Sequence, residues 1–334
     1  MSISGILSSL CRAHGVSGYE GDITGVFGKL AAPYCGGMYS DEMGNSFYKS
    51  KYNRGRKTVM IEAHSDKIGL MVSHITESGF VLFAPVGGID RKILPAARVV
   101  ILGKEKMTGV IASVPPHLRK KQSFKLEDLC IDTGLSKKQL EGKIDIGDTI
   151  EFLTEYTPLD GDTVASSALD DRAGLAALIR ALELVGDGSK YDVILTSSVQ
   201  EEVGCRGARA AANAVKPDIY ICIDVTHGTT PDASSDTFEV GGGPAIGVGP
   251  NMTPNVTSCL IDTAKETEIK YQLEVMGGSS GTNAWEVQLA NRGTATGLVS
   301  IPLRYMHTPY EVLSLSDIED TAKLLAEFLK RGLL

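Results

Sequence analysis

The chain has 334 residues, of which 43% are hydrophobic and 22% are charged, and its formal net charge is −8 at pH 7. This composition excludes a mainly disordered protein, and the negative charge offers no basic surface to a nucleic acid. The length predicts about two domains.

Six cysteines are scattered along the chain without a Cys-x-x-Cys spacing, so we expect neither a disulfide framework nor a thiolate zinc site. Reduced thiols favour a cytoplasmic location. The N-terminal segment has no basic region ahead of an unbroken apolar run, and no segment approaches the roughly 20 apolar residues that a membrane span needs. We therefore expect no export and no membrane partner.

The first part of the chain is predicted to be helical and then to enter a sheet. Apolar residues at helical spacing predict a short amphipathic helix near the N-terminus, formed around Ile3, Ile6, Leu7 and Leu10. A loop rich in glycine and a second helix follow. Residues 58–64, TVMIEAH, then form a near-continuous apolar strand.

The middle of the chain has a different sequence pattern from the rest. From about residue 67 to 160, short β-type runs alternate with glycine, proline and clusters of charge, which predicts a small β-barrel or sandwich. After residue 162 the pattern alternates between helices, such as 169–185, and apolar strands, such as 191–199. This alternation predicts a mostly parallel α/β sheet flanked by helices.

The strand at 58–64 is of the same apolar type as the later strands, so we assign it to the later sheet. The β-rich middle is then an insertion into a discontinuous domain. We expect a catalytic domain formed by residues 1–68 and 160–334, interrupted by an inserted β-rich domain at 69–159.

Polar side chains mark the first of the predicted strand ends. His64 closes an apolar strand and Asp66 follows two residues later, so both side chains project from one face if the strand continues. Asp170 and Asp171 begin the long helix at 169–185. Each feature alone has an ordinary explanation: a histidine hydrogen-bonded to a carboxylate, or an aspartate that caps a helix.

Three further strand ends carry the same kinds of side chain. Glu201 and Glu202 follow the strand at 191–199, Asp224 ends the strand YICI, and His307 follows the strand GLVSIPLRY. The carboxyl ends of parallel strands meet at one edge of an open α/β sheet, where ligands bind. The sequence therefore predicts a site of imidazoles and carboxylates at that edge.

Two imidazoles with several carboxylates and no thiolate suit zinc, cobalt or manganese at a hydrolytic site. These residues exceed the three protein ligands of one catalytic zinc, and two divalent metal ions that share a bridging carboxylate fit their number. Adjacent glutamates point in different directions, so one can bind metal while the other acts as a general base.

Five segments, in this order, resemble the signature of the M42 family of co-catalytic metallo-aminopeptidases, the tetrahedral, deblocking or glutamyl type: AHSDKIGLMV, ALDDRAG, QEEVGCRGA, IDVT and RYMHTP. The resemblance covers nearly the whole chain. It implies that Asp170 bridges two metal ions. His64 and Asp224 would complete one metal site, and Glu202 and His307 would complete the other.

The resemblance also implies roles beyond the ligands. Glu201 would be the general base, and Asp66 would be the carboxylate that orients His64. The inserted domain would make dimer contacts or act as a lid. Family members typically assemble into twelve subunits built from dimers, which would act on short peptides. We therefore expect a two-metal aminopeptidase that forms a homo-oligomer.

Two positions depart from the family pattern and bear on substrate preference. Lys67 follows Asp66 where the family usually has glutamate, and Asn283 stands where it usually has aspartate. Lys67 could favour an acidic group in the substrate, or it could be a solvated surface lysine.

Three other functions compete with the aminopeptidase. A metal-dependent deacylase or amidohydrolase would use a similar centre. A glycosidase or endoglucanase that used Glu201 and Glu202 as its two carboxylates fits less well, because adjacent side chains do not easily straddle a glycosidic bond at roughly 5 to 9.5 Å separation. A binding or scaffold protein would not need a complete set of ligands with a general base.

Overall fold

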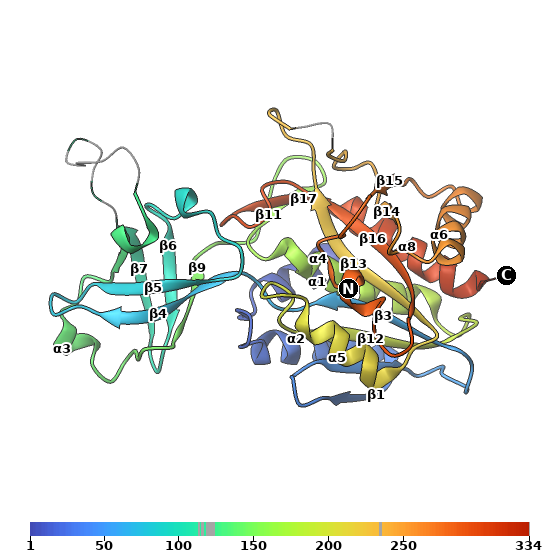
Figure 1. Cartoon of the computed structure of the whole chain (residues 1–334), viewed down its shortest axis with the longest axis horizontal. Coiled ribbons are helices and arrows are strands. Elements are labelled where there is room, and N and C mark those ends of the chain that lie inside the picture. Colours follow the sequence, from blue (N-terminus) through green and yellow to red (C-terminus); the bar gives the residue numbers. More distant parts are fainter. Residues whose placement is uncertain (113, 115–116, 118–123, 234–235, 334) are drawn as a thin grey trace.

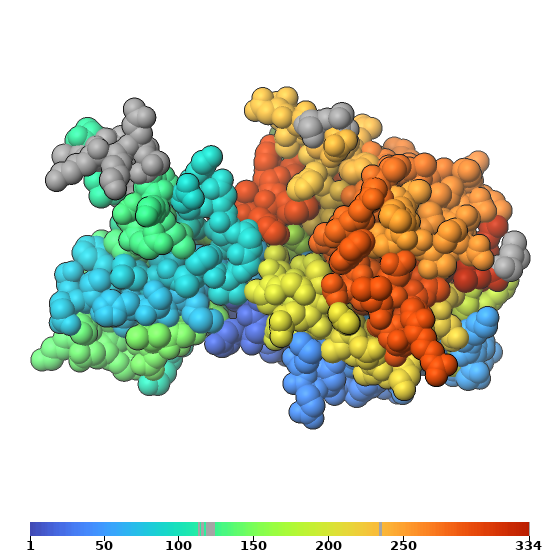
Figure 2. All heavy atoms as spheres, in the orientation of Figure 1, coloured from blue at the N-terminus to red at the C-terminus, as the bar shows by residue number. Residues whose placement is uncertain are grey.

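The structure is a computed structural model, and it describes all residues except 113, 115–116, 118–123, 234–235 and 334. The large body is an eight-stranded sheet covered by helices, and a β-barrel stands beside it (Figure 1). A space-filling view shows the two parts as distinct lobes (Figure 2). The predicted fold class is confirmed.

The main sheet is parallel at its centre, and an antiparallel pairing borders this central group on each side. Strands β12, β3, β13 and β16 run parallel to one another, whereas β2 and β14 pair antiparallel with this central group. In sheet order, the strands are β1 (Cys35–Ser40), β2 (Ser46–Ser50), β12 (Asp192–Ser198), β3 (Thr58–His64), β13 (Ile219–His227), β16 (Ala295–Leu303), β14 (Ala245–Val248) and β15 (Gln272–Val275).

Helices cover both faces of this sheet, because alternate residues of each central strand are apolar on opposite sides. Along β3, Val59 and Ile61 join the core on one face and Met60 joins the core on the other. The first face packs against α1 (Ile3–Cys11), α2 (Gly21–Ala31), α4 (Leu169–Val185), α6 (Pro254–Glu266) and α8 (Leu315–Arg331). The second face packs against α5 (Arg206–Val215) and α7 (Asn283–Val287).

The barrel is closed by six antiparallel strands and has its own apolar core, which includes Leu70, Ile101 and Ile150. Its strands, in order around the barrel, are β4 (Gly69–Ile75), β5 (Val81–Val86), β8 (Cys130–Asp132), β7 (Lys106–Ala112), β6 (Arg98–Leu102) and β9 (Thr149–Phe152). The short helix α3 (Lys137–Leu140) lies between β8 and β9 in the chain. The domain limits at 68/69 and 159/160 stay a prediction.

A small sheet follows the barrel in the chain and joins it to the main body. It consists of β10 (Thr157–Pro158), β11 (Thr163–Ser166) and β17 (Glu311–Ser314).

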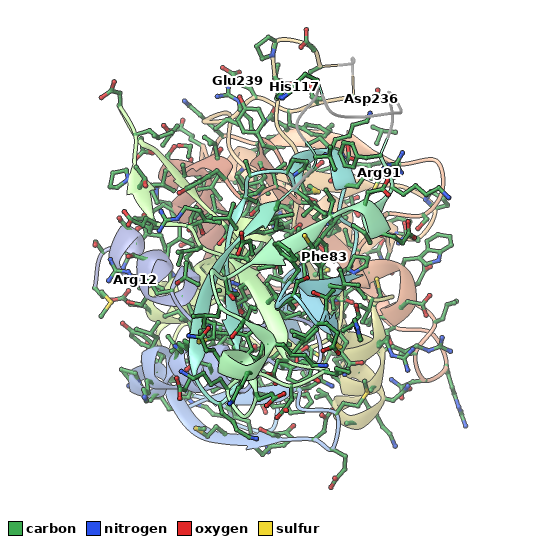
Figure 3. All side chains as sticks on the ribbon, turned by 90° about the vertical axis from the view of Figure 1, so that its left-hand side faces the viewer. Arg12, Phe83, Arg91, His117, Asp236 and Glu239 are labelled. Carbon is green, nitrogen blue, oxygen red and sulfur yellow. The ribbon has the colours of Figure 1, made fainter. Side chains whose placement is uncertain are left out.

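Viewed from the barrel side, Phe83 of β5 lies near the middle of the molecule, and His117, Asp236 and Glu239 lie at its upper end (Figure 3). Among the described residues, no helix is long and apolar enough to cross a lipid bilayer.

Candidate metal centre

The predicted site residues come together at the carboxyl edge of the main sheet. His64 is the last residue of β3, and Asp224 lies on the neighbouring strand β13. Glu201 and Glu202 follow β12, and His307 follows β16. Because these four strands are parallel neighbours, their ends deliver all five side chains to one place.

Asp170, at the start of α4, lies between the two imidazoles. Its Oδ1 is 3.0 Å from Nε2 of His64, and its Oδ2 is 3.4 Å from Nε2 of His307. The peptide bond between Asp170 and Asp171 is cis. One carboxylate thus contacts both histidines, which is the position that a bridging ligand occupies.

Each of the other two predicted ligands lies beside one of the two histidines. The Oε2 of Glu202 is 3.2 Å from Nε2 of His307, and the Oδ1 of Asp224 is 3.9 Å from Nε2 of His64. Ligand atoms of His64, Asp170 and Glu202 all lie within 4.8 Å of one another. Through its two contacts, Asp170 links the pair His64 and Asp224 to the pair His307 and Glu202.

The tautomer of His64 suits metal binding at Nε2. Its Nδ1 lies 3.1 Å from the backbone carbonyl of Asp66, which can only accept a hydrogen bond, so Nδ1 carries the proton. The carboxylate of Asp66 is further away, at 3.5 Å from Nδ1. This arrangement orients the ring and leaves Nε2 directed at Asp170 and Asp224.

The carboxylate of Asp66 mainly holds the segment that carries the two glutamates. It accepts hydrogen bonds from the backbone nitrogens of Glu201 at 2.9 Å and Glu202 at 3.1 Å, and from Oγ of Ser17 at 2.6 Å. Burial works against its charge, but His64 and these donors keep the pKa of Asp66 below its usual value.

Two buried acids of the centre were missed by the sequence reasoning. Ligand atoms of Asp171, His64 and Asp224 lie within 4.8 Å of one another. The Asp171 Oδ1 accepts a hydrogen bond from Gly174 N, while its buried Oδ2 has no partner among the described residues. The adjacent Asp-Asp pair was the available signal, but only its first member was assigned a role.

The second missed acid is Glu311, at the start of β17. Its two oxygens accept hydrogen bonds from the backbone nitrogens of Asp170, at 3.2 Å, and His307, at 2.9 Å. Glu311 therefore positions two candidate ligands. It is too far from Asp170 in the sequence for this contact to have been predicted. A lone glutamate at the head of an apolar strand, four residues after His307, was the only sign.

The pKa shifts in the centre indicate that its positive charge is too small to balance its carboxylates. Hydrogen bonds that the His307 ring donates to Asp170 and Glu202 raise the pKa of His307 to about 11, and burial raises the pKa of Glu202 to about 7. Burial also raises the pKa of Asp171 and Asp224 well above their usual values. Buried acids without cationic partners take up protons, and a divalent cation would supply the missing charge. The residues present therefore fit a metal centre.

A cavity of about 450 Å³ opens beside the centre and is lined by Asp170, Glu201, Glu202, Asp224 and His307. Glu201 accepts a hydrogen bond at Oε1 from the Cys205 thiol, and burial raises the pKa of its carboxyl.

The barrel closes one side of this cavity at Gly88, after β5. A Cβ at Gly88 would lie only 3.2 Å from Nδ1 of His307, so the absence of a side chain permits the close approach of the two lobes.

Lys67 is buried and paired, so the prediction of a solvated surface lysine is wrong. Its side chain bonds through Nζ to Oε2 of Glu151 on β9, at 2.9 Å, and the residue is only 6% exposed. Glu151 also accepts a hydrogen bond from Gly15 N and contacts His14 Nδ1. Burial opposes ionisation of Glu151, but Lys67 and His14 hold the pKa of its carboxyl well below its usual value.

Asn283 also points away from the large cavity. Its Nδ2 donates a hydrogen bond to Oε1 of Glu62, at 2.9 Å, on the α5/α7 face of β3. Glu62 is fully buried and also accepts hydrogen bonds from Tyr220 and Ser198. An aspartate at position 283 would set a second carboxylate against Glu62 and force one of the two to hold a proton. Among the described residues that line the cavity, neither Lys67 nor Asn283 appears.

A helix-covered parallel sheet whose carboxyl edge gathers imidazoles and carboxylates is typical of a metal-dependent hydrolase with an α/β fold. The M42 glutamyl aminopeptidase family model matches residues 44–324, and the chain belongs to this family. The family is metal-dependent, and its members are aminopeptidases. The protein is therefore an enzyme of this class, a hydrolase that acts on peptide bonds.

Relatives and solved structures agree with this assignment over almost the whole chain. The lysyl aminopeptidase of Pyrococcus furiosus is 34% identical, over 97% of this chain and 96% of its own. An aminopeptidase from the archaeon Desulfurococcus kamchatkensis is 33% identical with a TM-score of 0.93, over 99% of this chain and 95% of its own.

Two further structures bear on assembly and on activity. The TET1 peptidase of Pyrococcus horikoshii, which can assemble into a tetrahedron or a large octahedral shell, is 30% identical with a TM-score of 0.86, over 98% of this chain and 99% of its own. A structure from Thermotoga maritima titled as an endoglucanase is also 30% identical, with a TM-score of 0.81, over 98% of this chain and 97% of its own.

Proposed function

We propose that the protein is a two-metal aminopeptidase that removes N-terminal residues from short peptides. The observation that carries this proposal is the carboxylate of Asp170, which contacts both His64 and His307 at the wall of a large cavity. A shared carboxylate between two imidazoles is the arrangement that a pair of divalent ions needs. Membership of the aminopeptidase family supports the reaction class.

Five side chains would hold the two ions, which we expect to be zinc, cobalt or manganese. Asp170 would bridge them, with His64 and Asp224 completing one site and Glu202 and His307 completing the other. When bound, the ions would polarise the scissile carbonyl and lower the pKa of a water molecule.

Glu201 is the proposed general base. Its Oε1 is engaged by the Cys205 thiol, so Oε2 would take the proton of the attacking water and pass it to the leaving amine. Asp66 supports this role because its carboxylate holds the backbone nitrogens of both Glu201 and Glu202. The free α-amino group of the substrate would stay beside the centre, because only one carbon separates it from the scissile carbonyl.

The experiment that tests this function is a substrate panel with controlled metal content. We expect peptides with a free N-terminus to be cleaved from that end, and chelation to abolish activity that added zinc, cobalt or manganese restores. N-acetylated peptides distinguish a deacylase from an aminopeptidase, because a deacylase would release acetate from them. Full activity of a verified metal-free sample would refute the mechanism.

The endoglucanase title of the Thermotoga maritima structure makes a glycosidase the second candidate to test. The pair of carboxylates considered for it is Glu201 and Glu202, yet the Glu202 carboxylate already contacts His307. We expect no release of reducing sugar from soluble β-glucan. Sugar release by pure enzyme at a rate comparable with peptide cleavage would overturn the peptidase assignment.

We also propose that the protein forms a homo-oligomer, a dodecamer built from dimers in which the barrel makes contacts. The assembly described for the TET1 peptidase of Pyrococcus horikoshii supports this proposal. The expected result is sedimentation far above the mass of one 334-residue chain, with a smaller species after deletion within residues 70–158. A monomer at micromolar concentration would contradict the proposal.

A further inference from the structure

One carboxylate in the large cavity has no role in the proposed metal centre. The described residues that line the cavity include five carboxylates and no lysine or arginine; the acids are Asp170, Glu201, Glu202, Asp224 and Glu274. Two divalent ions would balance the charge of the first four. Glu274 on β15 would then remain as an uncompensated negative charge facing the substrate.

The Glu274 side chain is held in place from two other strands. Its Oε1 accepts a hydrogen bond from Oγ1 of Thr226 on β13, at 2.6 Å, and its Oε2 accepts one from Oγ of Ser300 on β16, at 2.7 Å. Both hydroxyl residues are buried, so the carboxylate is fixed rather than free to swing. Each carboxylate oxygen has a further lone pair, which leaves acceptors available for a cation in the cavity.

We propose that Glu274 selects substrates with a basic N-terminal residue, lysine or arginine, by binding the cationic end of that side chain. This inference rests on the proposed peptidase function. Val225 and Met306 also line the cavity, and the aliphatic stem of a lysine or arginine would pack against them while its charged end reaches Glu274. The volume of about 450 Å³ is within the range of roughly 300–1,000 Å³ for ligand pockets.

The substrate's α-ammonium group is the competing cation for this carboxylate, and the geometry disfavours it. That group must stay at the metal centre, one carbon from the scissile carbonyl. In the part of the chain that the structure describes, the hydrogen bonds of Glu274 go to Thr226 and Ser300 and none goes to a candidate ligand. Lys67, the cation that could have favoured acidic substrates according to the sequence, is engaged by Glu151.

The test compares lysyl and norleucyl p-nitroanilides, whose side chains differ essentially by the terminal amino group. We expect the wild-type enzyme to have the higher kcat/KM for the lysyl substrate. Glu274→Gln should lower the lysyl and arginyl values on the order of 10- to 100-fold and leave the norleucyl value essentially unchanged. Glu274→Lys should shift the preference towards a glutamyl substrate.

Glu266→Gln is the matched control, because it removes the same charge from the distant helix α6, where Glu266 pairs with Arg331. It should change none of the rates. Equal metal content and thermal unfolding of the variants and the wild type would show that the fold and the centre are intact. Inhibition of the wild type by free lysine but not by free norleucine tests the same contact without any substitution.

Three results would overturn the inference. The first is an equal loss for lysyl and norleucyl substrates in Glu274→Gln, which would assign Glu274 to the α-amino group. The second is an unchanged lysyl rate in that variant, and the third is a wild-type preference for glutamyl over lysyl substrates. Cleavage of none of these substrates by metal-loaded wild type would instead refute the peptidase function itself.

Discussion

Replacing Glu201 with glutamine is expected to lower turnover by a factor on the order of 10² to 10⁴ while both metal ions stay bound. Glutamine keeps the size of the side chain and can still accept the hydrogen bond from Cys205, but it cannot take a proton from water. Steady-state turnover and metal content by elemental analysis, measured on the same sample, check this result.

Glu202→Gln makes the same chemical change one residue along and is the matched comparison. Because the carboxylate of Glu202 contacts His307 and lies near Asp170, its loss should lower the occupancy of one metal site, and added metal should partly restore activity. If Glu201→Gln loses metal while Glu202→Gln keeps two ions and only turnover falls, the two roles are reversed. If both variants keep metal and rate, the active centre lies elsewhere.

Asp170 and Asp171 extend this comparison to the bridging position. Asp170→Asn should lose both ions, because one carboxylate contacts both imidazoles. Asp171→Asn should keep them, since an asparagine oxygen can still accept the hydrogen bond from Gly174 N. Loss of metal from Asp171→Asn would show that the group formed by Asp171, His64 and Asp224 binds an ion.

The second large effect is on stability and concerns the buried ion pair between the lobes. Lys67→Met is expected to lower the free energy of unfolding by about 3–5 kcal/mol, because it leaves the charge of Glu151 buried without its main cationic partner. The double variant Lys67→Met/Glu151→Met should recover part of this loss, since neither charge then remains. Chemical unfolding of the barrel and the sheet, followed by fluorescence and circular dichroism, measures the effect.

Lys104→Met is the control for this stability prediction. Lys104 also pairs with a carboxylate of the barrel, Asp145, but both side chains are exposed. Exposed pairs contribute at most about 1 kcal/mol, so this substitution should have little effect. An equal loss of stability in Lys67→Met and Lys104→Met would show that burial of the Lys67–Glu151 pair does not matter.

The local pattern of the chain was sufficient to predict its main elements. The near-continuous apolar run at 58–64 is β3, and the helix predicted at 169–185 is α4. The inserted β-rich segment forms a closed barrel. These elements were predictable because buried parallel strands and long helices carry their own hydrophobic pattern. The short strands β14 and β15 were not predicted, because four residues are too few to show a periodic pattern and such a strand depends on its neighbours in the sheet.

The order of strand ends was likewise enough to bring His64, Asp224 and the pair Glu201 and Glu202 to one edge, because parallel strands share a direction. Only the tertiary structure decided which groups meet there from distant parts of the chain. Glu311 accepts a hydrogen bond from Asp170 N although the two residues are 141 positions apart, and Lys67 pairs with Glu151, which is 84 positions away. Glu274 enters the cavity because β15 folds beside β14 at the sheet edge. Such contacts depend on packing between elements, which has no periodic trace in the sequence.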